Sequence, residues 1–298
     1  MHARPVVGRM IPRTSLVLVA FVLALAGCTE RTQAPPAEGG GSAADRTQDP
    51  ADGMDHDVPP QAGEDEPSNE DALAPGPHEV ESDEVAIGNG SAYYARPVGA
   101  GPWPGVVMIH EWWGLNDHIR DMARLLSSEG YAVVAVDLLG DVATTSAEAQ
   151  ALTRAYNATD GVKTMRAAAA YLRDDAHALS VASLGWCFGG GQSLQLALSG
   201  EPLFATVLYY GAPVTDPARL AQIDGPVLGI FGVEDRSIPL DKVEAFDRNL
   251  TAAGVVHEIH VYPGVGHAFA NPSGASWAPE ETADAWAKTK AFLAEAAR

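Results

Sequence analysis

Basic residues are scarce in this sequence. It contains 19 Lys and Arg against 39 Asp and Glu, which gives a formal net charge of −20 at pH 7. So acidic a chain repels other polyanions, and this argues against nucleic acid and anionic lipid as binding partners. Much of the charge lies between Thr29 and Pro77, so it says little about a catalytic pocket elsewhere.

The sequence also lacks the motifs that mark cofactor sites. No spacing of Cys, His, Asp and Glu is typical of a metal site. No glycine-rich loop has the pattern that cradles phosphate groups. The sequence therefore predicts neither a metal nor a cofactor, and His56, in the acidic run Met54–Asp57, is expected to be solvated.

Long apolar runs are missing too. The short run Ser15–Ala26 follows three arginines, is short for a membrane span, and is closed by Leu25-Ala26-Gly27-Cys28. These features are typical of a secretory signal. The closing tetrapeptide resembles the bacterial lipobox, which predicts a lipoprotein signal peptide at 1–27 and a lipid on Cys28. The protein would then be exported and membrane-anchored, on the periplasmic or cell-surface side of a bacterial membrane. An ordinary signal peptide or a short anchor helix is the alternative.

Large apolar residues are nearly absent from residues 28–78, where Pro, Gly, Ala and acidic residues dominate. Such a stretch cannot bury enough surface to offset the entropy of ordering it. We predict a disordered tether here and a single folded domain at 79–298. With lipid on Cys28, Cys187 would be the lone free thiol of the chain. A free thiol in an exported protein is exposed to oxidants, so its presence calls for a reason such as catalysis.

Apolar, strand-like runs alternate with helical patterns through the predicted domain. A hairpin is expected over Glu84–Pro97, turning at Gly88–Gly90. Near-continuous apolar strands separated by helices indicate an α/β fold, with a mostly parallel sheet and helices on both faces. Helices are expected from Asn116 to Gly130, from Thr145, from Asp160 to Ala176 and after Pro279. Strands are expected at Gly105–Ile109, Tyr131–Asp137, Ser180–Leu184, Ala205–Tyr210, Val227–Phe231 and Val255–Tyr262.

The most informative stretch joins the strand Ser180–Leu184 to a helical run that includes Gln192. It reads Gly185-Trp186-Cys187-Phe188-Gly189, the sharp strand-to-helix turn that presents a nucleophile, with Cys in place of Ser. The turn leaves little room around its central residue, and the flanking glycines supply that room. The helix N-terminus points at the thiol, where its dipole favours a thiolate. A small buried cysteine on an ordinary turn is the structural alternative.

Two later strands end beside residues that suit a catalytic site. Asp235 lies just after Val227–Phe231, and His267 lies just after Val255–Tyr262. Parallel strands gather their carboxyl ends at one edge of a sheet. The chain order nucleophile, acid, histidine is that of the α/β-hydrolase triad. We therefore predict that both residues serve Cys187.

These motifs, spread over about residues 80–296, resemble the dienelactone hydrolase family. The matching segments are the elbow, Gly232-x-x-Asp235-x-x-x-Pro239, Gly266-His267-x-Phe269, and His110-Glu111-Trp112-Trp113-Gly114-Leu115-Asn116. The resemblance implies the α/β-hydrolase fold and a Cys187-Asp235-His267 triad that cleaves small-molecule esters or lactones through a thioester. It also implies that Glu111 lies beside the thiol and holds it before substrate arrives. Backbone N–H groups of Phe188 and Trp112 would form the oxyanion hole.

One position departs from the family pattern. The family's enzyme for dienelactone carries an arginine shortly after the catalytic histidine, where this chain has Asn271. The loop Leu138–Asp141 offers no arginine either, so a bidentate carboxylate clamp is not expected. Trp113, Phe269 and Asn271 are expected to line the substrate pocket.

Alternative roles remain open at this stage. Asp235 could be a turn residue or a helix cap before Pro239, which would leave Glu234 as the acid, and His267 could be a buried structural histidine. Two other function classes are a thiol redox sensor and a non-catalytic, hydrolase-like binding lipoprotein. A lone thiol fits the sensor poorly, because most such systems pair two. His110, His118, His257 and His260 are expected to be structural or surface residues.

Overall fold

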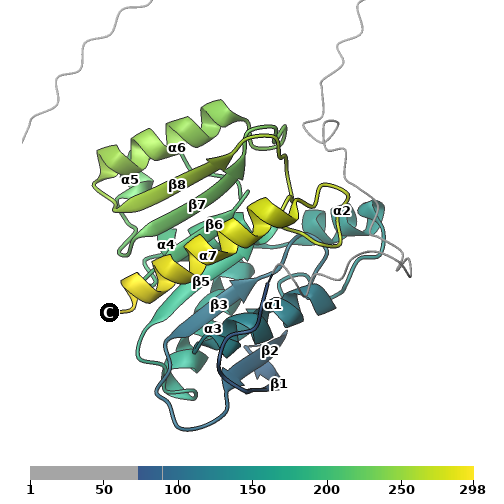
Figure 1. Ribbon diagram of the computed structural model, residues 1–298, viewed down its shortest axis with the longest axis vertical. Helices are drawn as coiled ribbons and strands as arrows, with labels where there is room; N and C mark the ends of the chain where they lie inside the picture. The colour runs from purple at the N-terminus through teal and green to yellow at the C-terminus, as the bar shows by residue number, and fades with distance from the viewer. Residues whose placement is uncertain (1–72, 89) are drawn as a thin grey trace, which may run out of the picture. The chain divides into compact units, whose positions relative to one another are not determined.

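The computed structural model describes residues 73–88 and 90–298. Its sheet has eight strands in the order β1-β2-β4-β3-β5-β6-β7-β8 (Figure 1). Strands β3 to β8 run parallel, and β1 and β2 join as an antiparallel hairpin against β4. The strands are β1 Val80–Ile87, β2 Gly90–Pro97, β3 Gly105–Ile109, β4 Ala132–Val136, β5 Val181–Trp186, β6 Thr206–Tyr209, β7 Val227–Gly232 and β8 His257–Tyr262.

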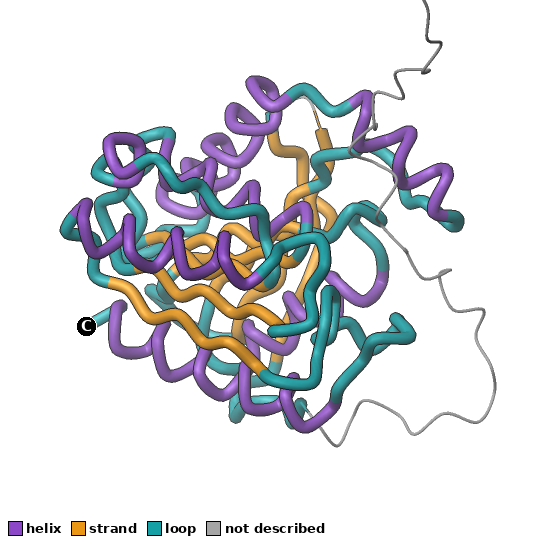
Figure 2. The backbone as a smooth tube through the Cα atoms, turned by 90° about the horizontal axis from the view of Figure 1, so that it is seen from above, coloured by secondary structure: helices purple, strands orange, loops and turns teal. Residues whose placement is uncertain are grey.

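Helices cover both faces of this sheet (Figures 1 and 2). Apolar residues of α1 and α7 pack against one face, and those of α3, α4, α5 and α6 pack against the other. The mostly parallel, doubly covered sheet predicted from the sequence is confirmed. The helices are α1 Asp117–Ser128, α2 Ser146–Ala155, α3 Ala158–Asp174, α4 Phe188–Leu198, α5 Pro217–Leu220, α6 Leu240–Ala253 and α7 Pro279–Ala296.

The central strands are mostly apolar because each face of the sheet is buried. In β3, Val107 and Ile109 enter the core beneath α3 and α4, whereas Val106 and Met108 enter the core beneath α1 and α7. Successive side chains of a strand point to opposite faces. A strand covered on both sides is therefore apolar at nearly every position, and this near-continuous apolar run is the pattern that predicted the buried strands from the sequence.

Side-chain caps explain where helices begin. Asn116 accepts from the Ile119 N–H at the start of α1, and Thr145 forms a capping box with Glu148 at the start of α2. Both starts were predicted. Helix α3 begins before the expected Asp160, because the Asn157 side chain accepts from the N–H groups of its first turn.

The N-terminal boundary of the domain differs from the predicted one. Residues 73–78, assigned to the tether, lie against the domain: the Gly76 N–H donates to Ser128 Oγ at 2.7 Å, and Leu73 packs on the core. Strand β1 also begins at Val80, before the expected Glu84. The predicted signal peptide, Cys28 and the rest of the tether lie outside the described residues. Within residues 73–88 and 90–298, no helix has the length and apolar character needed to cross a membrane.

Candidate active site

Cys187 occupies a strained turn between β5 and α4. Its φ is 52° and its ψ is −116°. A Cβ on Gly185 would lie 2.2 Å from the Gly189 carbonyl oxygen, and a Cβ on Gly189 would lie 2.3 Å from that of Ile109. Only glycine fits at these two positions, as the elbow motif requires. The close approach also brings the start of α4 against the end of β3, whose following loop carries Glu111.

His267 lies between Cys187 and Asp235. Its Nε2 is 3.1 Å from Cys187 Sγ, and its Nδ1 is 2.7 Å from Asp235 Oδ2. Burial alone would lower the pKa of His267. The Cys187 thiolate and hydrogen bonds from the ring to Asp235 and Cys187 oppose this effect, and together they raise the pKa well above its ordinary value. The site therefore favours the protonated, imidazolium form of His267.

Asp235, rather than Glu234, faces the imidazole. Its side chain is fully buried, whereas Glu234 is exposed. Oδ1 of Asp235 accepts from the backbone N–H groups of Ser237 and Ile238, at 2.8 and 2.9 Å. These two bonds hold the carboxylate in one orientation and leave Oδ2 for His267. Asp235 thus orders the turn before α6 through Oδ1 and contacts His267 through Oδ2, but it does not cap α6, whose N-cap residue is Pro239.

Glu111 lies in the same site, but its carboxylate bonds to other groups than the thiol. The resemblance implied that it holds Cys187, but its carboxylate is instead bonded to Tyr210 Oη, at 3.3 Å, and to Asn271 Nδ2. Burial raises the pKa of Glu111 to about 7, against the lowering effects of the His267 charge and of these two donors. In this structure the partner of the thiol is His267.

The predicted oxyanion residues come from adjoining segments. Phe188 is the first residue of α4, whose N-cap, Cys187, makes no side-chain capping bond. The first N–H groups of a helix have no intrahelical acceptor, so they suit an anion. Trp112 follows Glu111 and is buried, and its ring lies 4.9 Å from that of Trp113. Trp112, Trp113 and Phe188 share one apolar cluster with Ala149 of α2.

Two residues expected to line the pocket are buried beside it. Phe269 has no exposed surface, and its ring packs against those of Tyr210 and Tyr262 at 5.7 and 5.3 Å. It therefore supports the site from the core. Asn271 is 6 % exposed and donates to Glu111, so its amide is already engaged within the protein. Trp113 is half-buried and remains a candidate for substrate contact.

The four other histidines considered from the sequence are buried or bonded to nearby residues. His110 is fully buried, with Nδ1 bonded to the Glu111 carbonyl and Nε2 accepting from the Leu138 N–H. Burial lowers its pKa and that of His118, the latter to about 4. His257 and His260 contact Asp247 and Glu258. His110 thus fixes the loop that carries Glu111.

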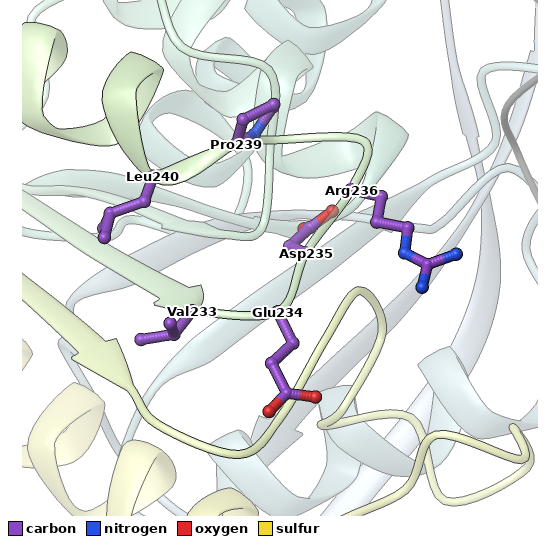
Figure 3. A pocket seen from close by; sticks show the side chains of 6 residues that line it. All are labelled: Val233, Glu234, Asp235, Arg236, Pro239 and Leu240. Carbon is purple, nitrogen blue, oxygen red and sulfur yellow. The ribbon is translucent and has the colours of Figure 1, made fainter.

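A surface pocket lies beside the acid loop that follows β7. Its volume is about 510 Å³, and Figure 3 shows the side chains of Glu234 and Arg236 directed differently from the Asp235 carboxylate. Arg236 is exposed, so its guanidinium is accessible to a small anionic group. The pocket is lined by Val233, Glu234, Asp235, Arg236, Pro239 and Leu240.

Tyr210 is the site residue that the sequence reasoning missed. It follows β6 directly, is fully buried, and has a φ of 35°. Of the four non-glycine residues with positive φ in the described part of the chain, three lie here: Cys187, Tyr210 and Ala268. Strained backbone gathers at functional sites. The available signal was its place at the end of a parallel strand next to the nucleophile strand.

A doubly covered, mostly parallel sheet with a cysteine elbow, an acid after β7 and a histidine after β8 defines an α/β-hydrolase. Comparison with known proteins gives the family: the model of the dienelactone hydrolase family matches residues 91–297, and the chain belongs to this family. Membership of this family and the similarity to its named relatives show that the chain is a hydrolase that resembles dienelactone hydrolase.

Individual proteins similar to this chain carry names of the same family. A Salmonella typhimurium protein provisionally named carboxymethylenebutenolidase is 31% identical over 223 residues, covering 68% of this chain and 82% of its own. One from Synechocystis, with the same provisional name, is 31% identical over 67% of this chain and 89% of its own. A Klebsiella pneumoniae crystal structure, provisionally titled dienelactone hydrolase, has a TM-score of 0.66 at 31% identity and covers 72% of this chain and 99% of its own.

Proposed function

We propose that this chain hydrolyses an ester or lactone bond of a small molecule, with Cys187 as the nucleophile. The observation that carries the proposal is the continuous contact from Cys187 Sγ through His267 to Asp235, at 3.1 and 2.7 Å. A nucleophile bonded to a base, which a third group orients, is the arrangement that activates a thiol. Family membership supports the reaction class.

The first half of the proposed reaction forms a thioester. His267 takes the proton of Cys187, and the thiolate attacks the carbonyl carbon, while N–H groups of Phe188 and Trp112 stabilise the oxyanion. The C–O bond then breaks, and the His267 imidazolium gives its proton to the departing alkoxide. Asp235 keeps the imidazole in the required tautomer through its bond to Nδ1.

The second half releases the acid. His267, again neutral, takes a proton from water, and the resulting hydroxide attacks the thioester carbonyl. The C–S bond breaks, and the proton held by His267 returns to the Cys187 sulfur. Water is the only co-reactant, and no electrons are exchanged with an outside partner.

The decisive experiment is trapping of the intermediate. Wild-type protein is mixed with p-nitrophenyl acetate, quenched in acid and digested, and the acetyl mass is sought on the peptide that contains Cys187. We expect a burst of p-nitrophenol equal to the acetylated fraction, and loss of both after treatment with a thiol-blocking reagent. Turnover that survives complete blocking of Cys187 would refute the proposal.

The substrates are proposed to be uncharged. The position of the family's arginine holds Asn271, whose amide donates to Glu111 inside the protein. A substrate carboxylate would find no bidentate partner there and would face the negative charge of Glu111. We expect kcat/KM for a lactone carboxylate to be lower than for its methyl ester, and the reverse order would contradict this preference.

Export and anchoring are a separate proposal, which rests on the N-terminal sequence outside the described residues. We propose that residues 1–27 are removed and that Cys28 carries lipid on the exported side of a bacterial membrane. Cys28→Ala should abolish partition into the detergent phase of Triton X-114 without changing kcat/KM on p-nitrophenyl acetate. Unchanged partition of the variant would indicate an uncleaved anchor helix.

A further inference from the structure

Tyr210 touches both His267 and Glu111. Its ring centroid lies 5.1 Å from that of the His267 imidazole, and its hydroxyl lies 3.3 Å from Glu111 Oε1. The side chain is 1% exposed, and its backbone is held at a φ of 35°. A buried ring that packs against the imidazole at an interplanar angle of 59° and bonds to the carboxylate through its hydroxyl sets the two groups relative to each other.

Asn271 serves the other oxygen of the same carboxylate. Its Nδ2 donates to Glu111 Oε2, while its Oδ1 accepts from the Ser273 N–H at 2.9 Å. The second bond fixes the orientation of the amide, because a flipped amide would present two donors to each other at Ser273. Each oxygen of Glu111 therefore receives one donor, and both donors favour the ionised carboxylate.

The groups around Glu111 come from several parts of the chain. His267 carries the positive charge that acts on it, and burial opposes its ionisation. In the described part of the chain no lysine or arginine forms a hydrogen bond or ion pair with the Glu111 side chain. The groups that act on the Glu111 side chain are Tyr210 after β6, and His267 and Asn271 after β8, whereas His110 bonds to the backbone carbonyl of Glu111.

We propose that Tyr210 and Asn271 are positioning residues that hold Glu111 as a carboxylate facing His267, where its charge stabilises the imidazolium formed when the Cys187 proton moves to Nε2. The inference rests on the proposed function. Because burial raises the pKa of Glu111 to about 7, this support is gained only as the pH rises through about 7. Below that pH, Glu111 is neutral and the imidazolium loses a favourable neighbour.

The test is the pH profile of Cys187 reactivity from pH 5 to 9. It is measured as kcat/KM on p-nitrophenyl acetate and as the rate of alkylation by iodoacetamide, with the rate of the full-length Cys187→Ala chain subtracted. In the wild type we expect an inflection near pH 7. In Tyr210→Phe and in Asn271→Leu, each of which removes one donor from the carboxylate, the inflection should move upward by about one pH unit. In Glu111→Gln it should vanish.

Tyr209→Phe is the matched control. Tyr209 is also fully buried and also loses one hydrogen bond, but its hydroxyl is bonded to Thr289 Oγ1 in the core. The pH profile of Tyr209→Phe should coincide with that of the wild type. A variant that only weakens the packing of the core should shift the inflection neither in kcat/KM nor in the alkylation rate. An inflection left unmoved by Tyr210→Phe, or one that persists in Glu111→Gln, would overturn the inference. If the wild type hydrolyses no ester, the proposed function fails, while the alkylation profile still decides the inference.

Discussion

Two buried carboxylates lie in this site, and their surroundings differ. Asp235, after β7, accepts two backbone N–H groups and the His267 imidazole. Glu111, after β3, accepts a tyrosine hydroxyl and a side-chain amide. Their exposed fractions are nearly equal, 3% and 4%, so burial alone does not separate them. The two carboxylates differ in the number and kind of their hydrogen-bond donors, and these donors decide how well a buried negative charge is compensated.

The difference suits the two groups to different work. Asp235 has its orientation set by its own loop and bonds to Nδ1 of His267, which suits it to the proposed role of holding the imidazole tautomer. Glu111 has few donors and a pKa raised by burial to about 7, so its charge changes near neutral pH. We therefore expect substitutions at the two positions to differ in size, in pH dependence and in their effect on stability.

The largest expected effect concerns Cys187, the proposed nucleophile. Cys187→Ala should lower kcat/KM for p-nitrophenyl acetate by a factor on the order of 10⁴ or more, since the site loses its attacking atom. The circular dichroism spectrum and the urea midpoint should stay near wild-type values, because Cys187 is only partly buried. A variant that retained wild-type rates would remove the basis for comparing the carboxylates at all.

Substitution of the two carboxylates should then separate them. Asp235→Asn should lower kcat/KM by about 10³ to 10⁴, because the amide favours the wrong imidazole tautomer. Glu111→Gln should cost only about tenfold at pH 8, the scale of one electrostatic contact. Both are measured by steady-state hydrolysis of p-nitrophenyl acetate. Equal losses would show that the two groups perform one task.

Non-additivity sharpens the same contrast. Residues that act as one unit share one loss, so Asp235→Asn and His267→Ala should each add little to Cys187→Ala. The double variants are assayed at high enzyme concentration against the Cys187→Ala background. Losses that multiplied would mean that Asp235 and His267 support catalysis independently of the thiol.

Glu111 should make a pH-dependent contribution to stability. Its folded-state pKa is raised from 4.5 to about 7, so the contribution of Glu111 to wild-type stability declines as the pH rises from about 4.5 to about 7 and then levels off. Glu111→Gln escapes this penalty, and its free energy of unfolding relative to wild type should be about 3 kcal/mol more favourable at pH 8 than at pH 4.

Urea denaturation of both proteins at the two pH values measures this difference. Asp235→Asn, compared in the same way, should instead be destabilised at pH 8 by about 1–2 kcal/mol, because its backbone bonds lose their charge assistance. A Glu111→Gln protein with the same pH dependence as wild type would mean that Glu111 does not titrate in this range.

The smallest expected effect lies on the surface beside Asp235. Arg236 is exposed at the edge of the pocket after β7, so its attraction for a substrate carboxylate is weakened by solvent. Arg236→Ala should lower kcat/KM for an acidic lactone about twofold to fivefold and leave its methyl ester unchanged. Glu234→Ala, at the exposed neighbouring position, should raise kcat/KM for the acidic lactone. No response from either variant would place the substrate away from this pocket.

Much of the fold could be predicted from local sequence. Three kinds of feature depend only on residues close together in the chain: the apolar runs, the helix caps at Asn116 and Thr145, and the glycines at 185 and 189. Each can therefore be recognised directly in the amino-acid sequence. Parallel topology then brings the ends of β5, β7 and β8 to one edge whatever their side chains are. This is why Cys187, Asp235 and His267 could be expected to meet.

The partners of Glu111 could not be predicted in this way. Tyr210 and Asn271 lie 99 and 160 residues along the chain from Glu111, and neither belongs to a motif with a known spacing from it. The family resemblance implied that Glu111 lies beside the thiol, and Asn271 was expected to line the substrate pocket. Packing of the loops after β3, β6 and β8 decided instead that the amide and the tyrosine hydroxyl meet the carboxylate. The physical reason is that the direction of a buried side chain depends on the volume left by its neighbours, and in this site those neighbours come from segments that only the folded sheet brings together.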